Sequence, residues 1–270
     1  MKKYILFFLL PVLIGGCEKT YNDVIDAKII SYQVISTSIE SVNSDSLITY
    51  SPFDSLITIR LKINSSKDIN GIYCSIVAPD GNPLNSSQIQ LLDNGNAVNG
   101  DSAAGDNIYS NKFPMSRNDI VGLYTVNFFV TDAGNSSKIT AVQSFVYDNG
   151  QSNLPPQLTN LVAPDTVAVV SPKSVIFLSV VPSDPNGRRD VKSVYFISYK
   201  PDGSTSGNKN ELLDDGNFKL DGDIQAGDGI YSILIEVTPQ NTKGTYRFDF
   251  QAMDWGGALS DILSHNIVIK

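Results

Sequence analysis

Cysteine and histidine are scarce in this chain of 270 residues, which contains two cysteines and one histidine. A zinc finger, an iron–sulfur cluster and a disulfide-rich scaffold each need more such residues, so these three classes are excluded. Basic residues are also few, 20 against 28 acidic ones, which gives a formal charge of −8. A phosphate backbone is bound by a basic surface, so we expect no nucleic-acid partner.

The apolar stretch at the N-terminus is too short to cross a membrane. It covers residues 4–14 and is interrupted by Pro11. A helix needs about 20 apolar residues to span the hydrocarbon core, which is about 30 Å thick. Because Lys2 and Lys3 precede the stretch, the pattern predicts a signal peptide.

The leader ends in Ile14-Gly15-Gly16-Cys17, which resembles the lipobox of bacterial lipoproteins. The resemblance implies that residues 1–16 are removed and that Cys17 carries a diacylglycerol, with further acylation such as palmitate on its amine. Each buried CH₂ group contributes about 0.8 kcal/mol, so several acyl chains anchor firmly. The alternative is an ordinary secretory signal in which the cysteine has no role.

Lipid is expected to be the membrane anchor because the rest of the chain is acidic. Removal of Lys2 and Lys3 changes the formal charge from −8 to −10, and such a body is not attracted to anionic lipid. Residues 17–27 form a polar tether. Glu18, and not the aspartate that marks inner-membrane retention, follows the cysteine. We therefore expect a bacterial envelope protein at the outer membrane or cell surface.

The chain contains an internal repeat. Residues 91–110 read LLDNGNAVNGDSAAGDNIYS and residues 212–232 read LLDDGNFKLDGDIQAGDGIYS. The same register matches further segments, among them Pro79-Asp80-Gly81 with Pro201-Asp202-Gly203 and Gly122-Leu123-Tyr124 with Gly244-Thr245-Tyr246. The repeat predicts one domain at 28–148 and a second at 157–270. The linker 149–156 includes two prolines, which disfavour helix.

Hydrophobic residues alternate with a period of two in both copies. The alternating positions are Ile57, Ile59, Leu61 and Ile63; Tyr124, Val126, Phe128 and Val130; and Tyr246, Phe248, Phe250 and Ala252. Neither copy has a long apolar stripe with helical spacing. The pattern predicts an all-β chain of two tandem immunoglobulin-like β-sandwich domains, each with seven or eight strands.

The Gly-x-Tyr at Tyr124 and Tyr246 resembles the tyrosine corner of immunoglobulin-like and fibronectin-like domains. The resemblance implies that the tyrosine hydroxyl ties the start of the strand to the preceding connection. The residue two places later is Val126 or Phe248, not the disulfide cysteine of antibody domains. We therefore expect both cores to be stabilised by packing alone.

An acidic, glycine-rich loop occurs in both copies and resembles a loop of bacterial surface modules called choice-of-anchor X domains. Carboxylates between glycines are typical of tight turns, in which they accept backbone N–H groups. They are also ligands that Ca²⁺ prefers. We favour the turn and keep calcium, the only cofactor considered, as the alternative. Its candidate ligands are Asp93, Asp101 and Asp106 in the first loop, and Asp214, Asp223 and Asp228 in the second.

The sequence gives little support for catalysis. Gly100-Asp101-Ser102 is similar to the nucleophile block of some esterases, but the histidine base would have to be His265 in the other repeat. Cys74 falls in a predicted strand and is expected in the core. No phosphate-binding glycine loop precedes a predicted helix. We therefore expect a protein that is not an enzyme.

Trp255 is the single tryptophan and lies in the connection after the second Gly-x-Tyr strand. We expect it to cap the second core, and the alternative is a platform for a sugar or a protein partner. Taken together, the sequence predicts a membrane-anchored envelope lipoprotein that serves as a binding, adhesion or spacer module for a protein or glycan partner. The alternatives are a carbohydrate-binding accessory lipoprotein and a purely structural envelope component.

Overall fold

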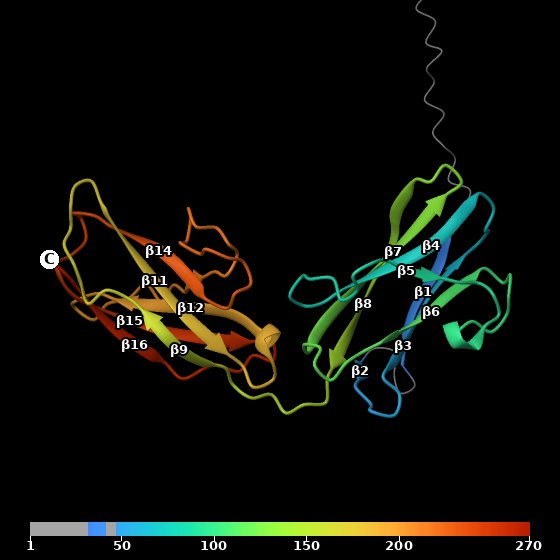
Figure 1. Ribbon diagram of the computed structural model, residues 1–270, viewed down its shortest axis with the longest axis horizontal. Helices are drawn as coiled ribbons and strands as arrows, with labels where there is room; N and C mark the ends of the chain where they lie inside the picture. The colour runs from blue at the N-terminus through green and yellow to red at the C-terminus, as the bar shows by residue number, and fades with distance from the viewer. Residues whose placement is uncertain (1–31, 42–46) are drawn as a thin grey trace, which may run out of the picture. The chain divides into compact units, whose positions relative to one another are not determined.

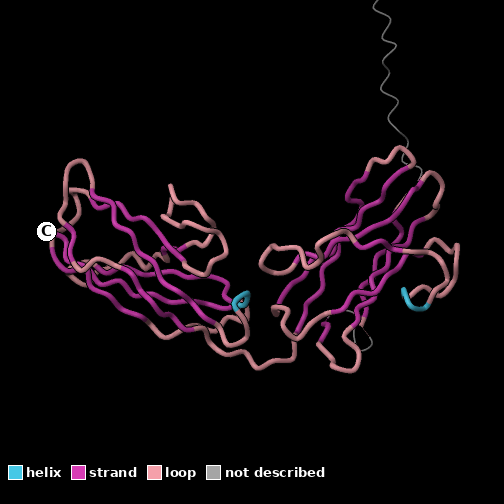
Figure 2. Tube along the Cα trace, in the orientation of Figure 1, coloured by secondary structure: helices cyan, strands magenta, loops and turns pink. Residues whose placement is uncertain are grey.

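The computed structural model describes residues 32–41 and 47–270 (Figure 1). The signal peptide, Cys17 and the tether 17–27 lie outside these described residues. Within the described part, strands dominate and the helical segments are two short 3₁₀ turns (Figure 2). The all-β prediction is therefore confirmed.

The first repeat forms two sheets. Its elements are β1 (Val34–Glu40), β2 (Leu47–Thr49), β3 (Leu56–Ile63), β4 (Ile69–Val77), β5 (Ile89–Leu91), η1 (Ala97–Asn99), β6 (Ile108–Pro114), β7 (Gly122–Asp132) and β8 (Ser137–Asp148). The strand orders are β1-β3-β6 and β2-β8-β7-β4-β5. Neighbouring strands are antiparallel except for β2 and β8. The two sheets form the layers of a sandwich.

The second repeat has the same topology. Its elements are β9 (Gln157–Val162), β10 (Thr166–Val167), β11 (Ser174–Ser183), η2 (Arg188–Asp190), β12 (Val191–Tyr199), β13 (Asn210–Leu212), β14 (Tyr231–Val237), β15 (Gly244–Asp254) and β16 (Leu263–Ile269). The strand orders β14-β11-β9 and β10-β16-β15-β12-β13 equal those of the first repeat with eight added to each number. The parallel pair recurs as β10 and β16. This match supports an internal duplication.

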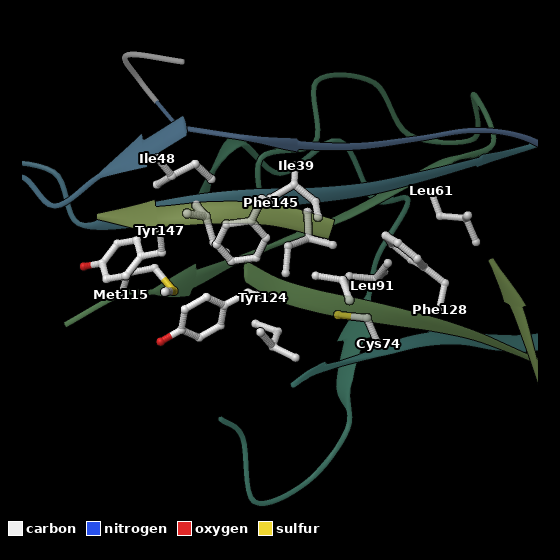
Figure 3. Packing of buried hydrophobic residues seen from close by; sticks show 14 of the residues in the cluster. Ile39, Ile48, Leu61, Cys74, Leu91, Met115, Tyr124, Phe128, Phe145 and Tyr147 are labelled. Carbon is white, nitrogen blue, oxygen red and sulfur yellow. The ribbon is translucent and has the colours of Figure 1, made fainter. Parts of the chain in front are cut away.

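The predicted alternation places one face of each strand in the core. Figure 3 shows Tyr124, Phe145 and Tyr147 inside the first sandwich, where the Tyr124 and Phe145 ring centroids are 5.3 Å apart. The buried alternating positions are Ile57, Ile59, Leu61 and Ile63 on β3, and Tyr124, Val126, Phe128 and Val130 on β7. Cys74 is also fully buried, and this burial raises the pKa of its thiol to about 12. Its predicted core position is confirmed.

Aromatic packing is equally important in the second core. Phe196 lies on β12 at the position that Cys74 occupies on β4. Its ring centroid lies 5.2 Å from that of Phe248 and 5.5 Å from that of Phe250. A cysteine and a phenylalanine therefore fill equivalent core positions, as expected for two cores that are packed without a disulfide.

The tyrosine corner is complete in the first sandwich only. The Tyr124 hydroxyl donates to the Ile120 carbonyl at 2.8 Å, as the resemblance implied. Within the described residues, the hydroxyl of Tyr246 has no such partner. Five residues before the two tyrosines lie Asp119 and Asn241, which play one role in both copies. Asp119 accepts Ser116 N–H and Asn241 accepts Thr238 N–H, both at 2.7 Å. An aspartate and an asparagine are interchangeable in this turn because each offers one oxygen.

The difference between the two tyrosines predicts unequal effects of removing their hydroxyls. We expect Tyr124→Phe to lower the free energy of unfolding by about 1–3 kcal/mol, because it leaves the buried Ile120 carbonyl without a donor. Tyr246→Phe should change it by less than about 0.5 kcal/mol. Urea unfolding followed by circular dichroism measures both. Equal losses in the two variants would contradict the assignment.

Candidate functional site

The two acidic loops are closed hairpin connections, one between β5 and β6 and the other between β13 and β14. A pair of backbone hydrogen bonds between Leu92 and Ser110 closes the base of the first loop, and Leu213 and Ser232 do the same in the second. Each loop therefore leaves and re-enters its sandwich at one point. Its interior must supply partners for the backbone N–H groups that have left the sheet.

Two carboxylates supply these partners in the first loop. Asp93 accepts Gly105 N–H at 2.6 Å and Asn107 N–H at 2.9 Å. Asp101 accepts the N–H groups of Asn94 and Gly95 at 2.5 and 2.6 Å. Each carboxylate thus reaches across the loop to backbone that is six to fourteen residues away in sequence.

Hydrogen bonding determines the charge state of Asp101. The side chain is 3% exposed, and this burial by itself raises the pKa of its carboxyl. The N–H groups of Gly95, Ala103 and Asn94 act in the opposite direction, and the net pKa lies below its usual value. Asp101 is therefore an ionised acceptor at the centre of the turn.

The second loop repeats the arrangement. Asp214 accepts Gly229 N–H at 2.8 Å, and Asp223 accepts Gly216 N–H at 2.5 Å. Gly216 has a φ of +76°, and a Cβ atom there would lie 2.9 Å from Ala226 N. A glycine is needed because of both its backbone conformation and this close approach. The guanidinium of Arg188 lies 3.6 Å from Asp214 and adds an ion pair that is partly screened by solvent.

The predicted calcium ligands come together in each loop. One carboxylate oxygen from each of Asp93, Asp101 and Asp106 lies within 4.8 Å of the other two, and Asp214, Asp223 and Asp228 form the same group. These carboxylates already accept backbone N–H groups, which favours the turn interpretation. Calcium binding by these loops stays a prediction.

A third group of carboxylates was not predicted from the sequence. Asp184 follows β11, Asp190 ends η2 and Asp254 ends β15, and one oxygen of each lies within 4.8 Å of the others. Asp190 is 2% exposed and Asp254 is fully buried. Burial and its neighbours' charges raise the pKa of Asp190 to about 6, with burial as the larger cause and Asp184 and Asp254 following.

Strand register shows why this group was missed. Val191 pairs with Asp254 as Ile69 pairs with Asp132, so Asp190 corresponds to Asp68 in the first repeat. Asp68 is exposed, whereas Asp190 is buried. The sequence repeat aligns Asp68 with Asp190, but it does not show that only the second copy buries this aspartate.

Trp255 follows Asp254 and is half-buried. Its ring centroid lies 5.1 Å from Lys192 Nζ, and it lines a cavity of about 360 Å³ with residues that include Glu211, Tyr231 and Met253. Of the side chains described, those that pack on the second core do not include Trp255. The packing of the described side chains therefore does not support a cap on the second core, and the binding platform stays a prediction.

The two residues considered for esterase chemistry have other local surroundings. His265 lies on β16, where its Nε2 atom is 3.3 Å from the Pro164 carbonyl and 3.5 Å from Asp165 Oδ1. Ser102 is exposed in the loop between β5 and β6. The position of His265 thus follows from its strand, and that of Ser102 from its loop.

Comparisons with known proteins give structural likeness only. No family model matches the chain, and no curated protein matches it. It is similar to fibronectin(III)-like modules of CbhA from Clostridium thermocellum, with 15% identity and a TM-score of 0.29 over 87% of this chain and 94% of that one. It is also similar to a tetra-tandem repeat from the extending region of a large adhesion protein, with 13% identity and a TM-score of 0.37 over 87% of this chain and 50% of that one. It is similar as well to the FN1–FN3 domains of chicken CNTN1, with 11% identity and a TM-score of 0.28 over 88% of this chain and 66% of that one.

In the described part of the chain, no helix has the length and apolar character required to cross a membrane.

The turn interpretation predicts a large effect of Asp101→Ala. We expect a loss of about 2–4 kcal/mol in the free energy of unfolding, because several charge-assisted hydrogen bonds disappear from a buried position. Asp106→Ala is the control, since Asp106 is exposed and, of the N–H groups in the described residues, accepts only that of Ile108, and it should cost less than about 1 kcal/mol.

The same pair of proteins tests the pKa. A lowered folded-state pKa means that Asp101 contributes stability above the ordinary aspartate pKa of 3.8, and that this contribution is lost as the pH falls through the folded-state pKa. The stability difference between wild type and Asp101→Ala should therefore shrink in acid. Denaturant titrations across this pH range measure it, and a difference that grows in acid would contradict the prediction.

Proposed function

We propose that the chain is a lipid-anchored protein of the bacterial envelope whose two sandwiches act as a binding, adhesion or spacer module without catalysis. The observation that carries the proposal is the order of its parts: a lipobox-like Ile14-Gly15-Gly16-Cys17, a short polar tether and then two sandwiches of one topology. In this order the lipid at the N-terminus attaches the protein to the membrane, and the two sandwiches that follow are free to bind a partner. Loops on a rigid sandwich are the usual place for recognition.

The chemistry of the loops supports a role without catalysis. Asp93, Asp101, Asp214 and Asp223 use their oxygens to satisfy backbone N–H groups of their own turns. A catalytic acid or base needs an oxygen that is free to reach a substrate proton. The acidic loops therefore fit a structural role in each sandwich.

Anchoring is tested by removing the proposed acylation site. The wild-type protein should sediment with membranes and carry the added mass of its acyl chains, whereas Cys17→Ser should be soluble and lack that mass. Cys74→Ala is the matched control, because the chain has two cysteines and Cys74 is buried in the first core. Membrane fractionation and intact mass spectrometry measure both. Acylation that persists in Cys17→Ser would exclude the proposed anchor.

Carbohydrate binding is a second candidate function, favoured by the surroundings of Trp255. The cavity beside its ring also exposes Lys192 and Glu211, so an aromatic surface and two charged hydrogen-bonding groups lie together. Sugars present apolar C–H faces and hydroxyl edges, which suit such a mixture. In this second candidate function the lipid anchor is unchanged, and the second sandwich binds a glycan.

Glycan binding by the whole chain is tested on a glycan array. If this candidate is right, Trp255→Ala should weaken binding at least about tenfold, because loss of a stacked aromatic removes about 1.4 kcal/mol or more. Phe218→Ala removes a different exposed aromatic and should leave binding unchanged. Glycan binding that is equal in wild type and Trp255→Ala would exclude a role for this cavity.

A further inference from the structure

The carboxylate group of Asp184, Asp190 and Asp254 differs from the two acidic loops in how its oxygens are satisfied. Both oxygens of Asp190 and the Oδ2 atom of Asp184 are buried without a hydrogen-bond partner. Asp190 is 2% exposed, and one of its oxygens lies within 4.8 Å of an oxygen from each of the other two aspartates. A buried side chain without partners thus faces two further carboxylates.

Among the described residues, no positive side chain forms a salt bridge with any of these three aspartates. A buried carboxylate without a donor or counter-charge is strongly unfavourable, and three that converge add mutual repulsion. Such a group is stable only if a proton or a bound cation neutralises part of the charge.

The surroundings hold the three aspartates in place. Trp255 N–H donates to the Asp190 carbonyl at 3.0 Å, and Asp184 accepts Asn186 N–H at 2.7 Å. Asp254 accepts Ala258 N–H at 2.8 Å through Oδ1 and the Asn153 amide at 3.0 Å through Oδ2. Hydrogen bonds therefore fix the carboxylates of Asp184 and Asp254 and the backbone of Asp190 before any ion arrives, which lowers the entropic cost of binding.

The Asn153 side chain forms one wall of this group. It packs against Gly256, where an added Cβ atom would clash with the Asn153 amide nitrogen. The adjoining Ser152 and Leu154 are bonded to Asn186, whose amide donates to the Ser152 carbonyl and accepts Leu154 N–H. The segment that precedes β9 is thereby attached to the same corner of the second sandwich.

We propose that Asp184, Asp190 and Asp254 form a site for a divalent cation of the calcium class, separate from the two acidic loops. The ligands are Asp184 Oδ2, the two oxygens of Asp190 and Asp254 Oδ2. Ca²⁺ takes six to eight oxygens at about 2.3–2.6 Å, with water completing a site of this kind. An all-oxygen, all-carboxylate set suits such a hard cation better than zinc or copper.

The ion would join parts of the second sandwich that no strand pairing joins. Asp184 follows β11 of the three-stranded sheet, whereas Asp254 ends β15 of the five-stranded sheet. Asn153 adds the chain segment that leads into β9. Binding therefore ties both layers and the incoming chain together at one end of the fold.

Thermal unfolding of the whole chain in detergent tests the site. Millimolar calcium should raise the melting temperature of the second sandwich by about 5 °C or more relative to chelator, because the ion binds the folded state only. Asp190→Asn should abolish this rise and retain its fold in chelator, since it removes a buried charge. Asp228→Asn and Asp106→Asn are controls that remove an exposed carboxylate from each loop and should keep the rise.

Terbium luminescence gives a second readout. Trp255 is the single tryptophan of the chain and adjoins Asp254, so excitation selective for tryptophan should sensitise Tb³⁺ bound there. Calcium should displace the signal. Asp214 of the second loop also lines the cavity beside Trp255, so Asp228→Asn is measured alongside and should keep the signal. Asp190→Asn should weaken terbium binding at least about tenfold, and Asp184→Asn serves as an independent variant if Asp190→Asn does not fold.

The proposal would be overturned by no calcium-dependent rise in the wild-type protein, by no sensitised terbium signal, or by a rise of equal size in Asp190→Asn. Each would mean that a shared proton, and not a cation, neutralises the carboxylates. A rise that is lost in Asp228→Asn but kept in Asp190→Asn would assign calcium to the second loop and would likewise overturn the proposal.

Discussion

The need of every buried carboxylate for a donor or a counter-charge explains most of the polar structure in this protein. An ionised oxygen in a sandwich interior loses several kcal/mol of hydration unless hydrogen bonds or opposite charge replace it. Asp101 and Asp223 meet this requirement with backbone N–H groups, and the loops take their shape from that exchange. The oxygens of Asp190 have no hydrogen-bond partner among the described protein groups, so a group from outside the protein is needed there.

Internal duplication separates what the fold requires from what one copy has added. Strand order, the parallel edge pair and the two acidic turns recur in both repeats, so they belong to the common fold. The buried Asp190 and the indole of Trp255 have no counterpart in the first repeat, where the matching positions are the exposed Asp68 and Ala133. The second sandwich is therefore the more specialised of the two.

The sequence was sufficient for the architecture because period-two alternation and a self-match can be read from the order of residues, without knowing which residues meet in the fold. Alternation on β3 and β7 identified the residues that the cores bury, and the self-match indicated two sandwiches. The Tyr124 hydrogen bond followed from a short motif, but its absence at Tyr246 depends on the connection that precedes each strand. Asp184, Asp190 and Asp254 were missed because the fold alone brings together residues up to 70 positions apart.

The supply of backbone donors, rather than burial or residue type, distinguishes the acidic group that is suited to an ion, because Asp101 and Asp223 are as buried as Asp190. The chain has many aspartates, and the most conspicuous ones in the sequence lie in glycine-rich loops where backbone donors already surround them. Asp184, Asp190 and Asp254 lie where the two sheet layers and the segment before β9 meet. Three of their oxygens have no hydrogen-bond donor there. A cation at that corner would neutralise the charges and connect all three parts, so one ligand would serve both electrostatics and architecture.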